Sequence, residues 1–129
     1  MKLAITVSMI TLCSQAIADD YLAGQNQAPT INGCVLERQA QCPGADLQGA
    51  DLSNMDLRSA DFKGANLSGA NLSHTSLRGA NLDGASLDNV VGYRLQAYRA
   101  SMRGASLKNA DLQGMQGQYL FAQGADFSG

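Results

Sequence analysis

The chain has 129 residues, a length that suits one small domain and leaves no room for two ordinary cores. Its formal charge is −2 at pH 7, which excludes both the strong basic field that captures nucleic acid or anionic membrane and an acidic excess large enough to imitate DNA. Fourteen glycines and no tryptophan indicate many tight turns.

The N-terminal segment has the pattern of a secretory signal peptide, residues 1–18. Lys2 is followed by an apolar stretch from Leu3 to Leu12, and small residues at Ala16 and Ala18 precede Asp19. We expect cleavage after Ala18 and a mature protein that is periplasmic or secreted.

The residues argue against a lipid anchor at this segment and against a membrane span in the rest of the chain. A lipoprotein would be acylated at Cys13, but Leu12 occupies the place where a small residue is required. No other apolar run approaches the roughly 20 residues that span a bilayer, so we expect no membrane span.

Cleavage leaves two cysteines, Cys34 and Cys42, in a compartment where disulfides persist, and we expect them to pair. Together with the single His74 they cannot supply four ligands to a structural zinc ion. We therefore expect neither a metal nor a cofactor.

Residues 19–44 precede the regular part of the chain. They are polar at first, rich in turn residues at Pro29 and Asn32-Gly33, and apolar at Val35 and Leu36. We interpret them as a flexible lead and a cap, because a stack of strands needs a cover over its open edge and its uncovered apolar side chains.

From residue 45 to residue 129 the sequence keeps a strict five-residue period through seventeen quintets without an insertion. The central residue, starting at Leu47 and ending at Phe127, is large and apolar in thirteen of the seventeen. The residue two places earlier is Ala in eleven, the residue before the centre is Asp, Asn or Ser in thirteen, and the last residue is Gly in nine. Neither a helix nor a long strand has this period.

A short straight segment followed by a corner explains the pattern. Residues two apart in an extended segment point to the same side, and Gly, Asn and Asp adopt the conformations of tight turns. Stacked segments would bury the centre and the small residue before it, while pairing each backbone with its neighbours.

Stretches such as "GADLQGADLS" and "SADFKGANLSGANLS" resemble the pentapeptide repeat family, whose signature is Ala-(Asp/Asn)-Leu followed by two variable residues. The resemblance implies an all-β, right-handed quadrilateral β-helix with four quintets in each coil, hence a little over four coils over residues 45–129. "AQCPG", residues 40–44, also fits the frame and would place Cys42 against Phe62 of the next coil. A bond to Cys34 would then tie the cap over the end of the core.

Four quintets depart from the pattern, because a large residue stands at the small place while the centre has shrunk. The pairs are Val90 with Gly92, Leu95 with Ala97, Met115 with Gly117, and Leu120 with Ala122. Either the coil continues through a swap that conserves core volume, or residues 90–99 and 115–122 bulge out as loops. We favour the swap, since a loop would not be expected to keep the phase.

The acidic residues favour structure over catalysis. They recur immediately before the centre, where short polar side chains hold turns: Asp46, Asp51, Asp56, Asp61 and Asp111. No nucleophile, base and acid can be grouped around His74 from the sequence. We expect no enzyme activity and no catalytic residues.

One outer face concentrates arginine and tyrosine if residues twenty apart stack. Its members, with a pair adjacent across the corner, are Arg58, Arg78, Tyr93, Arg94, Tyr98, Arg99 and Tyr119. The neighbouring ladder of Lys63, Asp83, Arg103 and Gln123 alternates in sign, and we expect its charges to pair. Arg and Tyr are enriched at interface hot spots, so the first group predicts a docking face. The other interpretation is a hydrated basic face with an Arg99–Tyr119 cation–π contact.

Two classes of function follow. The first is an exported, non-enzymatic scaffold whose rigid coil binds another macromolecule, a protein or an anionic glycan. The second is implied by the resemblance, since some family members imitate DNA and bind DNA gyrase. That role needs a cytoplasmic, strongly acidic rod, and we place it below the scaffold, with no nucleic-acid partner expected.

The C-terminal coil suggests self-association. Its most apolar residues are Tyr119, Leu120, Phe121 and Phe127, and an uncovered last coil exposes unpaired backbone. Two chains could bury these ends against each other, and the resemblance implies the same C-terminal homodimer.

Overall fold

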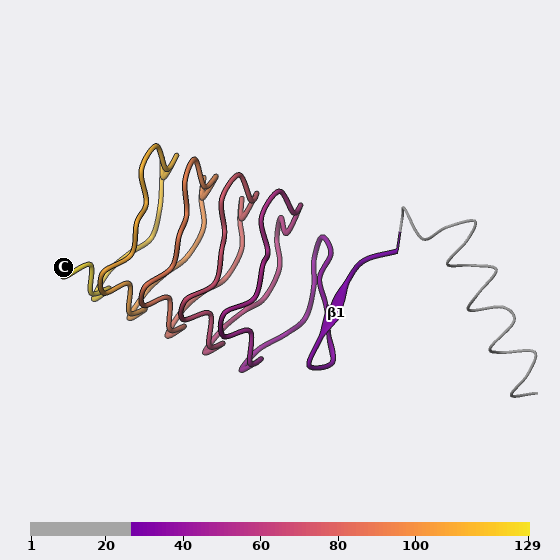
Figure 1. The fold of residues 1–129 in the computed structure, drawn as a ribbon. Helices are drawn as coiled ribbons and strands as arrows, with labels where there is room; N and C mark the ends of the chain where they lie inside the picture. The colour runs from indigo at the N-terminus through magenta and orange to yellow at the C-terminus, as the bar shows by residue number, and fades with distance from the viewer. Residues whose placement is uncertain (1–26) are drawn as a thin grey trace, which may run out of the picture.

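The structure, a computed structural model, describes residues 27–129 (Figure 1). They form an antiparallel hairpin of strands β1 (Thr30–Ile31) and β2 (Cys34–Val35), followed by a stack of coils. This part of the chain contains no helix that is long and apolar enough to cross a membrane. The predicted signal peptide and its cleavage after Ala18 lie outside the described residues.

Each coil uses twenty residues, or four quintets. Parallel bridges join residues twenty apart without interruption, from Gln41 with Asp61 to Ser106 with Asp126. Between bridged coils the backbone bonds run in both directions. Leu67 N donates to Ser86 O at 2.7 Å, and Ser86 N donates to the carbonyl of Ala65 at 2.9 Å. This ladder confirms the predicted β-helix and its four quintets per coil.

The corners explain the remaining letters of the quintet. At one of them Ala70 N donates to Leu67 O at 3.0 Å, which closes a tight turn, and Gly69 has a φ of 70°. Positive φ at this place is typical of a type II turn and favours glycine. The side chain before the centre holds the same turn, because Asn66 Oδ1 accepts a bond from Ser68 N at 3.1 Å.

The predicted structural role of the aspartates is confirmed. Each of the six carboxylates before a centre, the five predicted ones and Asp126, accepts a bond from the backbone N–H two residues later, at 2.9–3.3 Å. At Ser101 and Ser106 an aspartate of the preceding coil supplies the acceptor instead, whereas Ser86 pairs with Ser68 Oγ and the buried Ser76 Oγ has no partner among the described residues. Asp83 accepts bonds from Ser101 Oγ at 2.5 Å and from Arg103 N at 2.9 Å.

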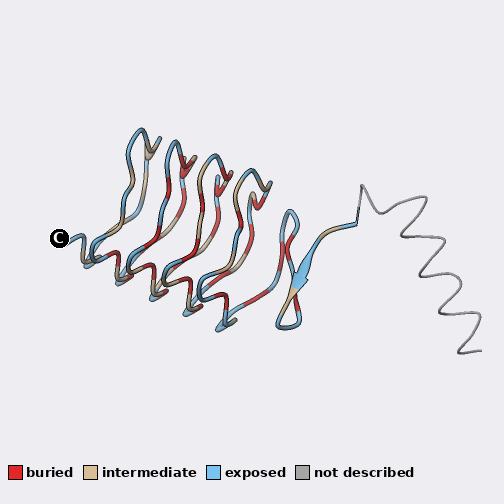
Figure 2. Cartoon of the chain, in the orientation of Figure 1, coloured by how far each residue is buried: buried red, intermediate tan, exposed pale blue. Residues whose placement is uncertain are grey.

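We name the four sides of the coil after their first repeat centres. The sides are the Leu47 side (centres 47, 67, 87, 107, 127), the Leu52 side (52, 72, 92, 112), the Leu57 side (57, 77, 97, 117) and the Phe62 side (42, 62, 82, 102, 122). The centres from residue 47 to residue 107 are buried. Figure 2 shows buried positions recurring at the same place in successive coils and giving way to half-buried ones in the last coil.

The four unusual quintets remain in the coil, as the volume-conserving swap predicts. Val90 and Leu95 are 1% and 0% exposed, and the bridges at Val91 and Gln96 keep the twenty-residue spacing. A small centre suits this packing, since a Cβ at Gly92 would lie 2.9 Å from Leu112 Cδ2 and that side chain would have to move. The alternative of bulged loops over residues 90–99 and 115–122 is excluded.

The hairpin caps the N-terminal end of the core. A disulfide joins Cys34 of β2 to Cys42, with a Cα–Cα distance of 5.5 Å, as the sequence predicts. Leu36 is buried, Ile31 packs partly against the core, and Asn32 Nδ2 donates to Asp46 O at 2.8 Å. The ladder already includes residues 40–44, so the first regular quintet is the one that contains Cys42.

The last of the described coils, residues 110–129, is less buried than the coils before it. Leu112, Met115 and Leu120 are only partly buried, and Phe127 is 47% exposed. In the earlier coils the N–H groups of the centre and of the corner donate to the following coil, whereas eight such groups of residues 110–129 have no backbone acceptor among the described residues: those of residues 112, 114, 117, 119, 122, 124, 127 and 129. This end therefore presents both apolar side chains and unpaired donors.

Candidate binding surface

Bulky side chains occupy left-handed corners on two sides only. Among the residues described, every corner of the Phe62 side is glycine, from Gly44 to Gly124. At the corners of the Leu52 and Leu57 sides, positive φ is found instead at four large residues: His74, Arg94, Arg99 and Tyr119. An L-residue in this conformation costs about 1–2 kcal/mol relative to the right-handed one. These side chains are thus held where glycine would be easier.

The first of these corners, after the Leu57 side, carries a continuous column of cations and rings. The Cζ atom of Arg78 lies 5.4 Å from the centre of the Tyr98 ring. Arg99 stacks on both rings of the column, 5.2 Å from Tyr98 and 5.8 Å from Tyr119. The two rings meet edge to face at 5.5 Å. Four of the seven predicted docking residues are therefore brought into one cluster.

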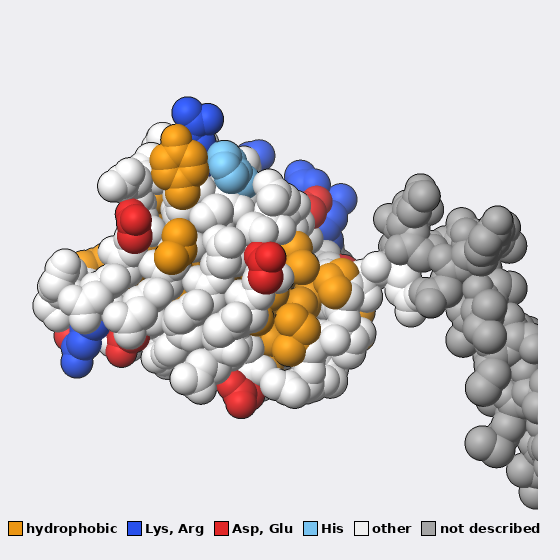
Figure 3. Space-filling view, viewed as in Figure 1, with side chains coloured by type: hydrophobic (Ala, Val, Ile, Leu, Met, Phe, Trp, Pro, Cys, Tyr) orange, Lys and Arg blue, Asp and Glu red, His pale blue; other side chains and the backbone are white. Residues whose placement is uncertain are grey.

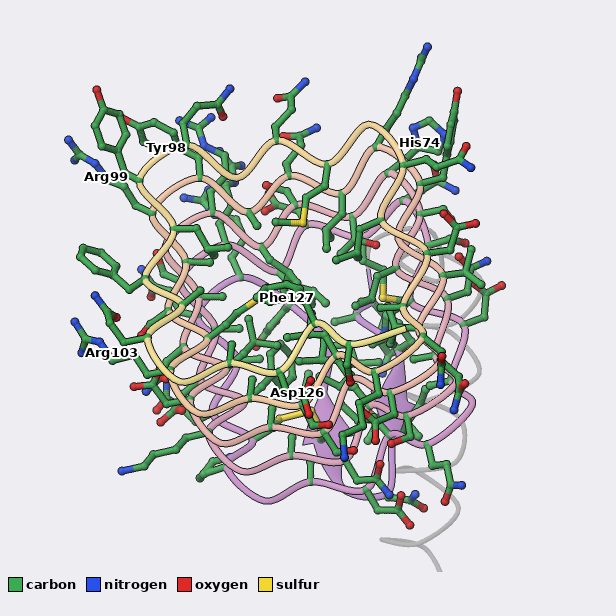
Figure 4. All side chains as sticks on the ribbon, turned by 90° about the vertical axis from the view of Figure 1, so that its left-hand side faces the viewer. His74, Tyr98, Arg99, Arg103, Asp126 and Phe127 are labelled. Carbon is green, nitrogen blue, oxygen red and sulfur yellow. A yellow bond between two sulfur atoms is a disulfide. The ribbon has the colours of Figure 1, made fainter. Side chains whose placement is uncertain are left out.

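The second corner, after the Leu52 side, carries a smaller group. Arg94 lies 5.3 Å from the centre of the Tyr93 ring, and His74 meets the same ring edge-on at 5.5 Å. In Figure 3 the histidine, in pale blue, lies beside an apolar group at the rim of the molecule. Figure 4, viewed along the coils, places His74 at one corner and Tyr98 with Arg99 at the next. The two clusters therefore flank the Leu57 side at its opposite corners.

Arg58 differs from the other predicted members because it is ion-paired. Its Nε and Nη2 atoms donate to the two carboxylate oxygens of Asp56 at 2.7 and 2.5 Å, and Arg38 Nε lies 3.9 Å from the same carboxylate. The bonds from Arg58 hold the pKa of Asp56 below its ordinary value, and they raise the pKa of Arg58 in turn. Its charge is largely satisfied within the chain.

The Phe62 side departs from the expected pairing of alternating charges. Asp83 is bonded to Ser101 and to the backbone of Arg103, and the described residues show no ion pair from Asp83 to Lys63 or Arg103. The Arg103 guanidinium instead donates to Gln123 Oε1 at 3.2 Å and lies 5.1 Å from the centre of the Phe121 ring. The Asp83 carboxylate bonds to a hydroxyl and to the backbone of the turn, so the Arg103 guanidinium has no carboxylate partner among the described residues.

Sequence reasoning therefore missed two residues of the surface, Arg103 and Phe121. The signal that could have found them is a spacing of eighteen, which brings the place after one centre against the place before the centre in the next coil. The same spacing joins Ser68 to Ser86 and Asp88 to Ser106. A search at a spacing of twenty alone does not show these diagonal contacts.

Other sites have less to offer. Residues 27–129 contain no group of three His, Cys, Asp or Glu side chains that could hold a metal ion. A hollow between the cap and the first coil is lined by seven uncharged residues: Asn32, Gly33, Cys34, Gln41, Cys42, Pro43 and Ala45. It contains no acid or base, so the arginine-rich corners remain the better candidate for function.

The family model for pentapeptide repeats matches residues 38–73 and 65–91 of this chain, in eight copies. No curated protein sequence matches this chain. Among solved structures, a pentapeptide repeat protein, Rfr23, from the cyanobacterium Cyanothece 51142 is similar, with 28% identity and a TM-score of 0.70. The match covers 81% of this chain and 69% of that one.

Two further structures share the fold over about half of their own length. HetL, a pentapeptide repeat protein involved in heterocyst differentiation regulation in the cyanobacterium Nostoc sp. strain PCC 7120, is 31% identical with a TM-score of 0.59. The match covers 68% of this chain and 47% of HetL. QnrB1, a plasmid-mediated fluoroquinolone resistance protein, is 20% identical with a TM-score of 0.59, over 70% of this chain and 49% of QnrB1. The repeat, the twenty-residue coil and these similarities together place the chain in the pentapeptide repeat family, with its right-handed quadrilateral β-helix.

Proposed function

We propose that this protein is an exported, non-enzymatic scaffold that binds another protein through the arginine and tyrosine side chains at the corners of its Leu57 side. One observation carries the proposal. Arg78, Arg94 and Arg99 each stack on an aromatic ring, and none of them has a carboxylate partner within residues 27–129. Arginine and tyrosine are the residues that most often dominate the energy of a protein interface.

The backbone supports the same proposal. Arg94, Arg99 and Tyr119 hold left-handed corners, and strained backbone of this kind persists where side-chain placement serves a function. The corners of Arg94 and Arg99 lie between paired coils, so a partner meets a preformed surface. Preformed surfaces lose less conformational entropy on binding.

The export part of the proposal depends on the N-terminal sequence pattern and on the disulfide. A Cys34–Cys42 bond is stable in an oxidising compartment, which fits a periplasmic or secreted protein. Mass spectrometry of the protein purified from cell fractions tests this. We expect an N-terminus at Asp19 in the envelope or medium, and an intact Met1 in the cytoplasm would overturn it.

The alternative role, gyrase binding by imitation of DNA, finds little support in the charges. A DNA mimic presents a dense row of carboxylates, but here the formal charge is only −2 and aspartates are bonded into turns. A supercoiling assay with purified gyrase is the direct test of this alternative. We expect no effect of the protein on supercoiling.

Capture from envelope extract tests the scaffold role. Immobilised wild-type protein is compared with an Arg78→Ser/Arg99→Ser variant and with a Lys63→Ser/Lys108→Ser control that removes the same charge elsewhere. All three variants are first shown to melt alike. We expect the first variant to lose partners that the wild type and the control retain. Equal recovery by all three at low and high salt would contradict the proposal.

We also propose that two copies associate through the open last coil. Phe127 is 47% exposed, and a second copy would supply acceptors for the backbone donors of this coil that have none among the described residues. A second copy that is related by a twofold axis would cover both.

A further inference from the structure

The arginines of this chain fall into two chemical classes. Arg58 is held by Asp56 and stacks on no ring, with Arg38 at the edge of the same carboxylate. The second class, which has no carboxylate partner within residues 27–129, stacks on aromatic rings instead: Arg78, Arg94, Arg99 and Arg103. The two classes do not overlap.

Three members of the second class belong to a single turn of the coil. Arg94 and Arg99 hold two successive corners and Arg103 directly precedes the next corner, Gly104, so the three form a band across the Leu57 and Phe62 sides. Figure 4 shows Arg99 and Arg103 at the two ends of one side of the coil. We call this band, with the rings that contact it, the basic–aromatic belt: Tyr93, Arg94, Tyr98, Arg99, Arg103, Tyr119 and Phe121.

Stacking prepares these arginines to bind carboxylates. The Cζ atom of each of these arginines lies 5.1–5.4 Å from a ring centre, and such a cation–π contact uses none of the five N–H donors of the guanidinium. Arg103 uses one of its five N–H donors to bond to Gln123 Oε1, at 3.2 Å. Two parallel bonds from the remaining edge match the two oxygens of one carboxylate. The rings also fix the long side chains, which reduces the entropy lost on binding.

We infer that the belt binds an acidic protein segment in which carboxylates are interspersed with apolar side chains. The inference rests on the proposed scaffold function and extends its surface onto the Phe62 side. Arginine edges would take the carboxylates, while the exposed rings, Phe121 at 42% and Tyr119 at 69%, would take the apolar groups. This combination of guanidinium and aromatic groups is typical of protein interfaces.

A uniform polyanion fits the belt less well. The whole chain has a formal charge of −2, so its long-range field does not attract a densely charged polymer such as nucleic acid or a sulfated glycan. Asp83 also lies beside Arg103 and would repel a continuous row of anions. A segment with separated carboxylates avoids this repulsion.

Fluorescence anisotropy with a defined probe tests the inference. The probe is a fluorescein-labelled peptide of about twelve residues that alternates glutamate with leucine and glycine, and a heparin oligosaccharide of similar charge serves as competitor. We expect Arg103→Ser and Phe121→Ser each to weaken peptide binding about five-fold, the size of one lost charge-assisted or apolar contact. Serine is the residue of the preceding coil at the Phe121 position, Ser101, so the fold is retained.

Matched variants complete the experiment. Lys63→Ser removes one charge from the same ladder, and Val35→Ser removes an apolar side chain that is also 42% exposed. We expect both to bind like the wild type, with the same melting temperature. If Arg103→Ser and Phe121→Ser bind as tightly as these controls while Arg78→Ser/Arg99→Ser is weaker, the extension of the site onto the Phe62 side is overturned and the proposed scaffold surface stands.

Three other outcomes also count against the inference. Unchanged binding in all of these variants would overturn the belt and the proposed scaffold surface together. Tighter binding of heparin than of the peptide would identify a polyanion site instead. No measurable binding of the peptide to the wild type at millimolar concentration would overturn the belt, and the capture experiment would then decide the scaffold function alone.

Discussion

Single residues at the corners of the coil determine both its backbone strain and its surface. The last place of each quintet has positive φ whether the residue is Gly64, with φ 68°, or Ser59, with φ 60°. Glycine adopts this conformation at no steric cost, and other L-residues are strained. Substitutions at the corners can therefore measure how much strain a side chain adds to the turn.

Gly64→Ala and Ser59→Gly test the strain with opposite signs. A Cβ at Gly64 has no atom within 4 Å, so Gly64→Ala isolates the backbone effect, and we expect a loss of about 1 kcal/mol of unfolding free energy. Ser59→Gly removes about 1–2 kcal/mol of backbone strain from the folded state. The extra freedom of glycine stabilises the unfolded chain by about 0.4–1 kcal/mol, so we expect a small net increase in unfolding free energy. Urea denaturation measures both changes. Shifts of the same sign would contradict the assignment.

The carboxylates make stability depend on pH. Hydrogen bonds from Ser101 and Ser106 hold the pKa values of Asp83 and Asp88 below the ordinary value. A depressed native pKa contributes stability above the unfolded pKa of about 3.9, and this contribution is lost as pH falls through the native value. We expect unfolding free energy to fall between about pH 5 and pH 2. An Asp83→Asn/Asp88→Asn variant should show a shallower fall, and an identical pH profile would count against these bonds.

At the scale of the element, each quintet stabilises the coil through one inward centre. Leu72 is 0% exposed, whereas Ser73 follows it on the outside and its hydroxyl makes no hydrogen bond among the described residues. Because the ladder fixes neighbouring coils, the structure cannot collapse around a deleted centre. The cavity left behind therefore adds to the lost burial.

Leu72→Ala should accordingly cost about 2–5 kcal/mol, while Ser73→Ala stays within about 0.5 kcal/mol of the wild type. Thermal melts of the two variants at the same protein concentration make the comparison. Equal melting temperatures would show that the inward and outward assignment of the quintet is wrong.

The cap is the second element, and its stability depends on the Cys34–Cys42 disulfide. The bond closes a short loop, with a sequence separation of 8 residues. In the chain-entropy model, such a bond stabilises the fold by about 2.5 kcal/mol. We expect a Cys34→Ser/Cys42→Ser variant to melt lower by a corresponding amount, and the oxidised wild type to melt like this variant after reduction. No change on reduction would contradict a tethered cap.

For the whole molecule, the two ends of the stack are unlike each other. The hairpin and the disulfide cover the N-terminal end, while residues 110–129 present Phe127 and eight centre and corner N–H groups without a backbone acceptor among the described residues. The face drawn in Figure 3 carries charges of both signs among uncharged and hydrophobic groups. Association through the last coil would therefore leave the arginine-bearing corners accessible.

Sedimentation velocity tests this association. We expect a dimer at tens of micromolar concentration and a shift to monomer for Phe127→Ser, because a polar side chain at the exposed centre weakens burial between the two ends. Val35→Ser, at the opposite end of the stack, serves as the control and should remain dimeric. A wild type that sediments only as monomer would overturn the proposed dimer.

The sequence by itself determined the period, the inward centres and the turn role of the aspartates, because each is a local property of five residues that repeats in phase. It also predicted the pairing of Cys34 with Cys42 and the column of Arg78, Tyr98, Arg99 and Tyr119. Once four quintets make a coil, residues twenty apart necessarily stack.

Only the tertiary structure decided which side chains contact one another diagonally between coils. Arg103 meets Phe121, and Asp83 bonds to Ser101 instead of pairing with a cation, because a side chain after one centre leans toward the place before the centre in the next coil. Arg58 is likewise removed from the free cations by a bond to Asp56 within its own quintet. Charge and spacing along the chain give the neighbours that are possible, and the rotamers and competing hydrogen bonds of the folded coil select among them.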